Sequence, residues 1–181
     1  MPLDPTPHPS LGIVGKVTIA IEASAHYANQ MNYAIKEATI QDALEVARNI
    51  RPEDKMEIEG LGHSLGSLPF SVALSTVAVS FYNKDGDIAG VGGICPVEVP
   101  RSGIIWMICT PTVQSQPITF VRQARKWLAS VESDYDVLWN YTDIRNTFHH
   151  KLLKMLGFKA LRILQPAPLY LPYYEIVKLC A

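Results

Sequence analysis

The chain alternates between apolar stretches that favour strands and stretches with helical spacing, which is the pattern of an α/β domain. Residues 71–82 and 88–97 are apolar, and the segment between them, Asn83-Lys84-Asp85-Gly86, has the composition of a tight turn. These two stretches therefore predict a long antiparallel hairpin. Residues 104–109 form the most apolar short stretch, so we predict that they are the central strand.

Four segments are predicted to form helices. Residues 39–50 begin with Thr39, a good capping residue, and carry acidic residues near their start. Residues 117–131 begin with Pro117, which suits the first turn of a helix. The other two helices are predicted at 52–59 and between Asn146 and Gly157, and further strands at 33–38, 137–141, 160–163 and 174–179.

The first 30 residues differ from the rest of the chain. Prolines at positions 2, 5, 7 and 9 make residues 1–10 extended, and residues 11–23 alternate loosely as a lone strand does. We therefore divide the chain into an extended N-terminal arm, residues 1–30, and a domain, residues 31–181. Two alternatives stay open for the arm, a tail that frays in solution and a segment ordered by a neighbouring subunit or partner.

Composition limits the classes of function. A chain of 181 residues, 48% of them hydrophobic, supports one sizeable core. The net charge of −1 argues against bulk electrostatic binding, and we expect no membrane partner and no specific nucleic-acid partner. Cys95, Cys109 and Cys180 have no metal-site or disulfide spacing, which predicts thiols in a reducing compartment. Residues 1–10 lack the basic region of a secretory signal, so no signal peptide is expected.

The segment from Asn146 to Phe158 carries the most informative pattern. Asn146 can cap the first turn of a helix, and Gly157 suits the left-handed residue after its last turn. Phe158 can then fold back onto the helix end. Apolar residues recur at three- and four-residue spacing and predict one buried stripe: Phe148, Leu152, Met155 and Leu156.

This segment resembles the last helix of GCN5-related N-acetyltransferases (GNATs). Asn146, Gly157 and Phe158 stand at the spacing of that superfamily. Leu153 stands where its members carry a tyrosine that protonates the departing coenzyme A thiolate. The order of predicted elements is similar too. The resemblance implies a GNAT-like α/β fold, with a mixed, mostly antiparallel sheet flanked by helices. The extended N-terminal arm lies outside the resemblance and is predicted from its own composition.

The segment that corresponds to the pyrophosphate turn departs further from the superfamily. GNATs bind the pyrophosphate with a glycine-rich turn whose N–H groups point at the phosphates from a helix N-terminus. Gln114 matches, but Pro117 and Thr119 stand where glycines belong. Proline lacks an N–H group, and threonine adds a side chain where the backbone approaches phosphate. These three residues are therefore vestigial candidates for cofactor binding.

The resemblance suggests further site residues. Glu98, Asp143 and His149 are conceivable bases for an amine, but we favour simpler explanations: a solvated strand end, a loop turn residue and a helix-face histidine. His149 and His150 are adjacent, so a helix points them apart and we expect no metal site. The remaining vestigial cofactor positions are Met107, Ile108 and Cys109, whose backbone belongs to the strand that polarises a thioester carbonyl in GNATs, and Asn146.

A different class of enzyme is suggested by Gly62-His63-Ser64-Leu65-Gly66, which matches the nucleophile elbow of serine hydrolases. Asp134, Asp136 or Asp143 and then His149 or His150 follow in the right order. The elbow needs a strand before the serine and a helix after it. An acidic helix is predicted before this segment and a β-like stretch after it, so a glycine-rich surface loop is the better explanation.

Within the superfamily, the chain looks closest to the internal virion protein A type of short-tailed bacteriophages. Residues 138–141, 146–147, 149, 152–157 and 105–106 carry this likeness. With the thiolate acid and the phosphate cradle both missing, it implies a catalytically degenerate acetyltransferase fold that acts as a structural or interaction component of a phage particle, located in the virion or host cytoplasm. We then expect no cofactor, multiple copies, and contact with other virion proteins through residues 1–25. The alternative is an active acyl-coenzyme A-dependent N-acyltransferase that binds acetyl-coenzyme A and uses water as its acid.

Deleting residues 1–25 is expected to leave a folded domain that no longer assembles. The apolar residues Val14, Val17, Ile19 and Ile21 can add a strand to the sheet edge of a partner. Circular dichroism and size-exclusion chromatography of the full and truncated chains test this expectation. Unfolding of the truncated chain would instead assign these residues to the core of the domain.

Overall fold

The computed structural model describes residues 33–180, so the predicted arm, residues 1–30, lies outside the described residues and stays a prediction. The described part contains a seven-stranded sheet with the order β1-β2-β3-β4-β5-β7-β6. The β4–β5 pair is parallel and the other pairs are antiparallel, which confirms the predicted mixed, mostly antiparallel α/β fold. The strands are β1 (Tyr33–Glu37), β2 (Val77–Asn83), β3 (Ile88–Pro96), β4 (Ser102–Cys109), β5 (Val137–Asp143), β6 (Lys159–Leu164) and β7 (Tyr173–Leu179).

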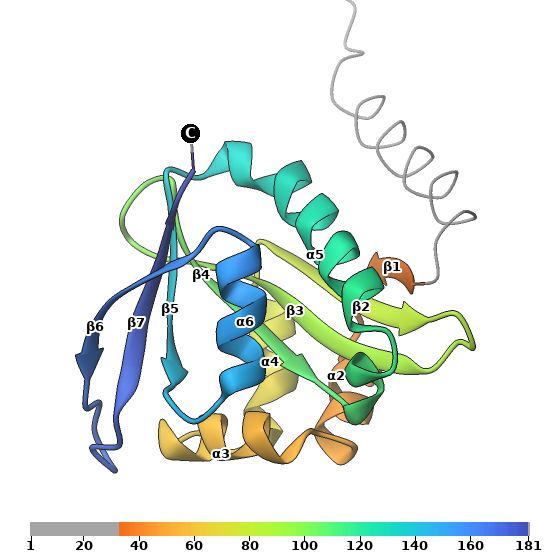
Figure 1. The fold of residues 1–181 in the computed structure, drawn as a ribbon, viewed down its shortest axis with the longest axis horizontal. Helices are drawn as coiled ribbons and strands as arrows, with labels where there is room; N and C mark the ends of the chain where they lie inside the picture. Colours follow the sequence, from red (N-terminus) through yellow and green to blue (C-terminus); the bar gives the residue numbers. More distant parts are fainter. Residues whose placement is uncertain (1–32, 181) are drawn as a thin grey trace, which may run out of the picture. The chain divides into compact units, whose positions relative to one another are not determined.

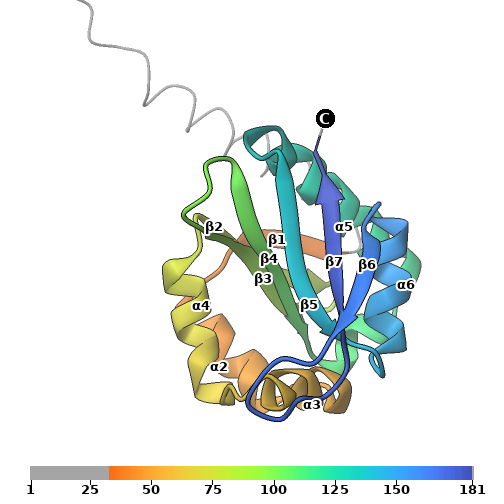
Figure 2. The same ribbon diagram turned by 90° about the vertical axis from the view of Figure 1, so that its left-hand side faces the viewer.

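Helices cover both faces of the sheet. As Figures 1 and 2 show, α2 and α4 lie on one face, α5 and α6 lie on the other, and α3 lies across one end. The described α-helices are α2 (Ile40–Arg48), α3 (Pro52–Gly60), α4 (Leu68–Leu74), α5 (Pro117–Val131) and α6 (Thr147–Met155), and short 3-10 turns are η1 (Leu65–Ser67), η2 (Pro111–Gln114) and η3 (Glu132–Asp134). Within residues 33–180, no helix combines the length and the apolar character needed to cross a membrane.

Each face of the sheet has its own core. Phe81 of β2 and Phe120 of α5 are buried on the α5 side, and their rings meet edge to face with centroids 5.2 Å apart. On the other face, Val46 of α2 packs with Leu68 and Val72 of α4. These two cores fix the helices against the sheet.

The start of α2 forms as its sequence predicts. The Thr39 hydroxyl accepts from the Asp42 N–H at 3.1 Å, and the Asp42 carboxylate accepts from the Thr39 N–H at 2.8 Å. The same carboxylate accepts from the hydroxyls of Ser80 and Tyr82 on β2. Asp42 therefore caps the helix and ties it to the sheet.

The strands β4 and β5 pair only near their beginnings. The parallel ladder joins residues 102–104 to residues 137–139, although the strands continue to Cys109 and Asp143. The side chain of Asn140 then donates to the Ile105 carbonyl at 2.6 Å. Beyond this point the two strands diverge, and the opening between them positions the candidate site.

The prediction of a strand over residues 71–82 is wrong at its beginning. The chain forms α4 as far as Leu74, and β2 starts only at Val77. Leu68 and Val72 lie four residues apart, so one helical face buries both against α2. This packing overrides the strand preference of an apolar stretch that is rich in β-branched residues.

Helix α6 forms largely as predicted. The Asn146 side chain accepts from the His149 N–H, and Gly157 has a left-handed φ of 90°. Phe158 is buried and its N–H donates to the Leu153 carbonyl. Met155 is 46% exposed, so its place in the buried stripe was predicted wrongly. The helix turns Leu153 inward instead.

Phe120→Ala is expected to lower the free energy of unfolding by about 3 to 5 kcal/mol, because it removes a buried ring from a closely packed core. The matched control is Ile118→Ala on the same helix, where the side chain is 77% exposed and the change should stay within about 0.5 kcal/mol. Urea denaturation measures both variants. Equal effects would contradict the assignment of the core.

Candidate active site between β4 and β5

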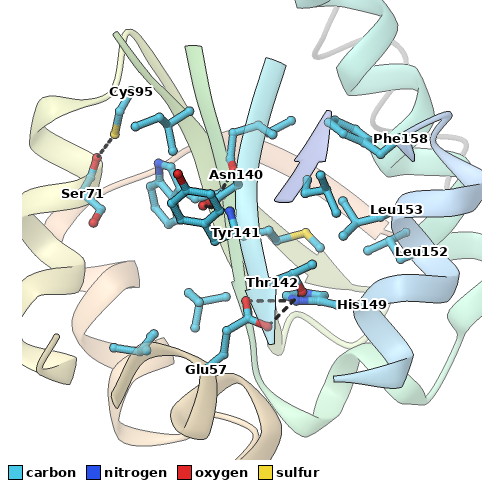
Figure 3. Close-up of a pocket in the computed structure, with 18 of the residues that line it drawn as sticks. Glu57, Ser71, Cys95, Asn140, Tyr141, Thr142, His149, Leu152, Leu153 and Phe158 are labelled. Carbon is cyan, nitrogen blue, oxygen red and sulfur yellow. Dashed lines mark hydrogen bonds and ion pairs between the residues drawn. The ribbon is translucent and has the colours of Figure 1, made fainter. Parts of the chain in front are cut away.

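A cavity of about 290 Å³ occupies the opening between β4 and β5. It reaches both faces of the sheet, because α4 contributes Leu68 and Ser71 whereas α6 contributes Leu152 and Leu153. Figure 3 shows this arrangement, with α4 on the left and α6 on the right. Most of the lining is apolar or aromatic. Among the described lining residues, Glu57 supplies the single carboxylate, and none is lysine or arginine.

The backbone of Met107 faces the opening. In the β3–β4 ladder, the Thr110 N–H donates to the Ala89 carbonyl, and hydrogen-bonded positions alternate along an antiparallel ladder. Met107 is three residues from Thr110, so its N–H and carbonyl point away from β3. They are directed to the side where β5 has diverged, and the residue lines the cavity.

Glu57 reaches the cavity from α3. Its Oε2 accepts from the Thr142 hydroxyl, the Asp143 N–H and the Asn146 amide, each at 3.1 Å. Its Oε1 lies 3.7 Å from Nδ1 of His149. One carboxylate oxygen therefore anchors the side chain, and the other faces the histidine.

Asp54, one turn earlier on α3, binds the end of β4. Its Oδ2 accepts from the Cys109 N–H at 2.7 Å, and its Oδ1 accepts from the Asn146 amide at 3.1 Å. Arg51 lies 3.3 Å from this carboxylate, and its own N–H donates to the Cys109 carbonyl at 2.9 Å. Helix α3 thus satisfies the backbone of Cys109 at a position that β5 does not reach.

His149 joins this network from α6. Its Nδ1 lies 3.1 Å from the side-chain nitrogen of Asn146. The side-chain oxygen of Asn146 accepts from the Arg51 guanidinium and from the backbone N–H of His149, which fixes the orientation of the amide. Nδ1 is therefore the acceptor in neutral His149, and both ring nitrogens carry protons in the cation, so Nε2 carries a proton in either state. Within the described residues this Nε2 has no hydrogen-bond partner, although the side chain is buried and lines the cavity.

The charges of the cluster balance. Burial lowers the pKa of His149, but the Asp54 carboxylate, the Cys109 thiol and Glu57 together hold this pKa well above its usual range. Burial also raises the pKa of the Cys109 thiol, which therefore stays neutral. Arg51, and His149 in its protonated form, then offset the charge of the two buried carboxylates.

The structure brings together part of the predicted site. Four of the predicted positions line the cavity: Met107, Ile108, His149 and Leu153. Asn146 and Cys109 lie behind the lining in the buried network. His149 is buried among charged groups, so describing it as an ordinary helix-face histidine is wrong.

The other candidate bases lie apart from the cavity. Glu98 is exposed between β3 and β4, in agreement with its explanation as a solvated strand end. Asp143 is buried at the end of β5, and its carboxylate lies 2.6 Å from the guanidinium of Arg145. Neither residue is part of the cavity lining.

The predicted pyrophosphate positions lie at the start of α5. Gln114 ends η2 and is exposed, Pro117 is the first residue of α5 as predicted, and Thr119 lies in its first turn. No side chain caps this helix start. None of these three residues lines the cavity.

Three side chains have atoms that could bind a metal ion within 4.8 Å of one another: Asp54, Cys109 and His149. The sequence analysis considered only the adjacent histidines and did not predict this grouping. The Asp54 oxygens already accept from backbone and amide groups, and Arg51 lies beside them. The contacts of this carboxylate are therefore those of an internal ion pair.

The possible nucleophile elbow is a surface loop. Ser64 is exposed, α3 rather than a strand precedes it, and it is not part of the cavity lining. The expectation of a β-like stretch after it was wrong, since η1 and α4 follow. Without the preceding strand, the geometry of an elbow is missing.

Arg51, Asp54 and Glu57 were missed by sequence reasoning. The acidic stretch 52–59 was predicted only as a helix, and its side chains contact residues that are 55 to 95 positions away in the sequence. One signal was present in the sequence: Asp54 and Glu57 are acidic residues one helical turn apart, shortly after Ile50-Arg51. This signal did not show which residues the two carboxylates contact.

The sequence matches no protein-family model and no curated protein. Solved structures do match: an aminoglycoside N(6')-acetyltransferase from Legionella pneumophila has a TM-score of 0.62 at 13% identity, over 83% of this chain and 94% of that chain. The chain has the GNAT acetyltransferase fold.

Two further solved structures share this GNAT fold. A GNAT-family acetyltransferase from Streptococcus pneumoniae gives a TM-score of 0.59 at 15% identity, over 82% of this chain and 99% of that chain. Spermidine N-acetyltransferase from Vibrio cholerae, in complex with CoA and spermine, gives 0.60 at 12% identity, over 82% and 96%. At these identities the comparison shows the GNAT fold alone.

The buried cluster makes stability depend on pH. The pKa of His149 is raised on folding, so its contribution to stability is complete below the unfolded pKa of about 6.5 and is lost as the pH rises through the folded pKa. We expect the difference in unfolding free energy between the wild type and His149→Gln to shrink from pH 6 upward, as measured by urea denaturation. A difference that grows with pH would contradict the charged histidine.

Proposed function

We propose that the chain is an acyl-coenzyme A-dependent N-acyltransferase, with the acyl thioester held in the opening between β4 and β5. One observation carries this proposal: the cavity joins the outward-facing backbone of Met107 to the Glu57–His149 pair. Such a backbone N–H can polarise a carbonyl oxygen, and the pair can move protons. The GNAT fold of the chain supports the same reaction class.

The residues present fit a pantetheine thioester better than they fit its pyrophosphate. Apolar groups such as Leu152 and Leu153 line the α6 side, and the backbone of Met107 offers a donor and an acceptor there. At the start of α5, Pro117 removes one N–H donor, but the amides of Ile118 and Thr119 lie in the first turn, where intrahelical acceptors are missing. Ile118 is 77% exposed, so an anion can approach this turn.

The proposed transfer balances its protons within the Glu57–His149 pair. The amine nitrogen bonds to the acyl carbon while the carbon–sulfur bond breaks. Oε1 of Glu57 accepts the proton that the amine loses, and Nε2 of His149 donates a proton to the leaving sulfur. The pair then holds a protonated Glu57 and a neutral His149 that keeps its Nδ1 proton beside Oε1. After the products leave, Oε1 gives its proton to solvent and Nε2 takes one from solvent, which restores the starting state.

His149 donates the proton to the leaving sulfur, a role that the side chain of Leu153 cannot perform. These residues are four apart on α6, so they lie on one helix face, and both line the cavity. A proton donor one turn earlier on the same face replaces the tyrosine of the GNAT signature. This assignment differs from the sequence-based alternative, in which water is the acid.

Glu57→Gln is expected to lower kcat for amine acylation by about 10²- to 10⁴-fold, while acetyl-coenzyme A still binds. Thiol release with acetyl-coenzyme A and a simple primary amine measures turnover, and calorimetric titration measures binding. Glu98→Gln is the matched control, since Glu98 is exposed and outside the cavity lining, and it should keep wild-type turnover. Equal activity of the two variants would remove Glu57 from the reaction.

A second candidate function is that of an interaction module in a phage particle, with other virion proteins as partners through residues 1–25. Leu153 at the acid position and Pro117 at the phosphate turn favour it, as does the sequence resemblance to phage virion proteins. Calorimetry distinguishes the two candidates. No acetyl-coenzyme A binding, together with copurification of the chain with assembled particles, would favour the interaction module over the enzyme.

A further inference from the structure

The two sides of the cavity differ in character. The α6 side contains Met107 and the leucines described above. On the α4 side, Trp106 packs with the core of α2 and α4, and its indole N–H is already held by the Ser75 hydroxyl at 2.9 Å. The wall there is completed by aromatic and aliphatic side chains: Tyr141, Ile58, Leu61 and Leu68. Ser71 lies on the same side, on α4.

Only one ammonium group can be neutralised in this cavity. Glu57 is the single carboxylate among the described lining residues, and its Oε2 is fully occupied by three donors. A second ammonium on the same acceptor would lie against Trp106, Tyr141 and Leu68. The ring faces of Trp106 and Tyr141 can attract an ammonium group, but this attraction offsets only part of the cost of burying a charge without a carboxylate partner.

On the basis of the proposed function, we infer that the acceptor is a primary monoamine with an apolar or aromatic body, seated on the α4 side against Trp106 and Tyr141. Its amino group points to Glu57, and its body replaces water along the α4 wall. Polyamines carry further charges that this wall does not neutralise. The α4 wall therefore sets the substrate class, while the reaction itself depends on Glu57 and His149.

The test compares hexylamine with the α,ω-diamine of the same chain length, which differs only by a second ammonium group. Calorimetric titration with acetyl-coenzyme A first establishes donor binding, and thiol release then gives kcat/KM for each amine. We expect the diamine value to be at least about tenfold lower. Ser71→Asp, which adds a carboxylate to the α4 wall, should raise the diamine value at least about tenfold and lower the hexylamine value.

Each outcome decides the inference. A diamine that is acylated as well as hexylamine, with the donor bound, overturns the acceptor class but leaves the proposed acyltransferase intact. Failure of acetyl-coenzyme A to bind overturns the proposed function, and the acceptor class with it. Donor binding without acylation of either amine also overturns the inference. A preference for hexylamine that Ser71→Asp reverses supports it.

Discussion

The arrangement of this domain depends on how the backbone of two diverging strands is satisfied. Strands β4 and β5 separate after a short parallel ladder, which would leave N–H groups at their ends without acceptors. Two carboxylates of α3 accept them instead: Asp54 binds the Cys109 N–H, and Glu57 binds the Asp143 N–H. Helix α3 therefore supplies hydrogen-bond acceptors to these two strand ends, whereas elsewhere in the sheet a neighbouring strand supplies them.

This solution brings charge into the interior. Two buried carboxylates need cations and donors, which Arg51, His149 and the Asn146 amide supply. The same groups stand at the inner end of the cavity. A requirement of the fold and the chemistry of the proposed site thus rest on one network, in which Asn146 contacts every other member.

The parts that sequence reasoning predicted well depend on local signals. Asn146 caps α6, Gly157 takes its left-handed conformation, and Thr39 starts α2, because each interaction spans only a few residues. The overall fold followed from a short resemblance and the order of elements.

The parts that it missed depend on contacts between distant segments. Residues 71–74, the second half of α4, were taken for a strand because their apolar residues suit both structures, and packing against α2 decides between them. Asp54 and Glu57 were predicted only as part of an acidic helix, because their partners lie 55 and 86 positions away in the sequence. Burial of a charge is visible only when those partners are known.

The divergence of β4 and β5 has a consequence for how such a domain can change. The width of the opening is set by a nine-residue helix bridging two strand ends, whereas the sheet itself is set by its ladders. A change in the length of α3 that keeps Asp54 and Glu57 on the two strand ends would therefore change the width of the opening, while the ladders keep the strand register.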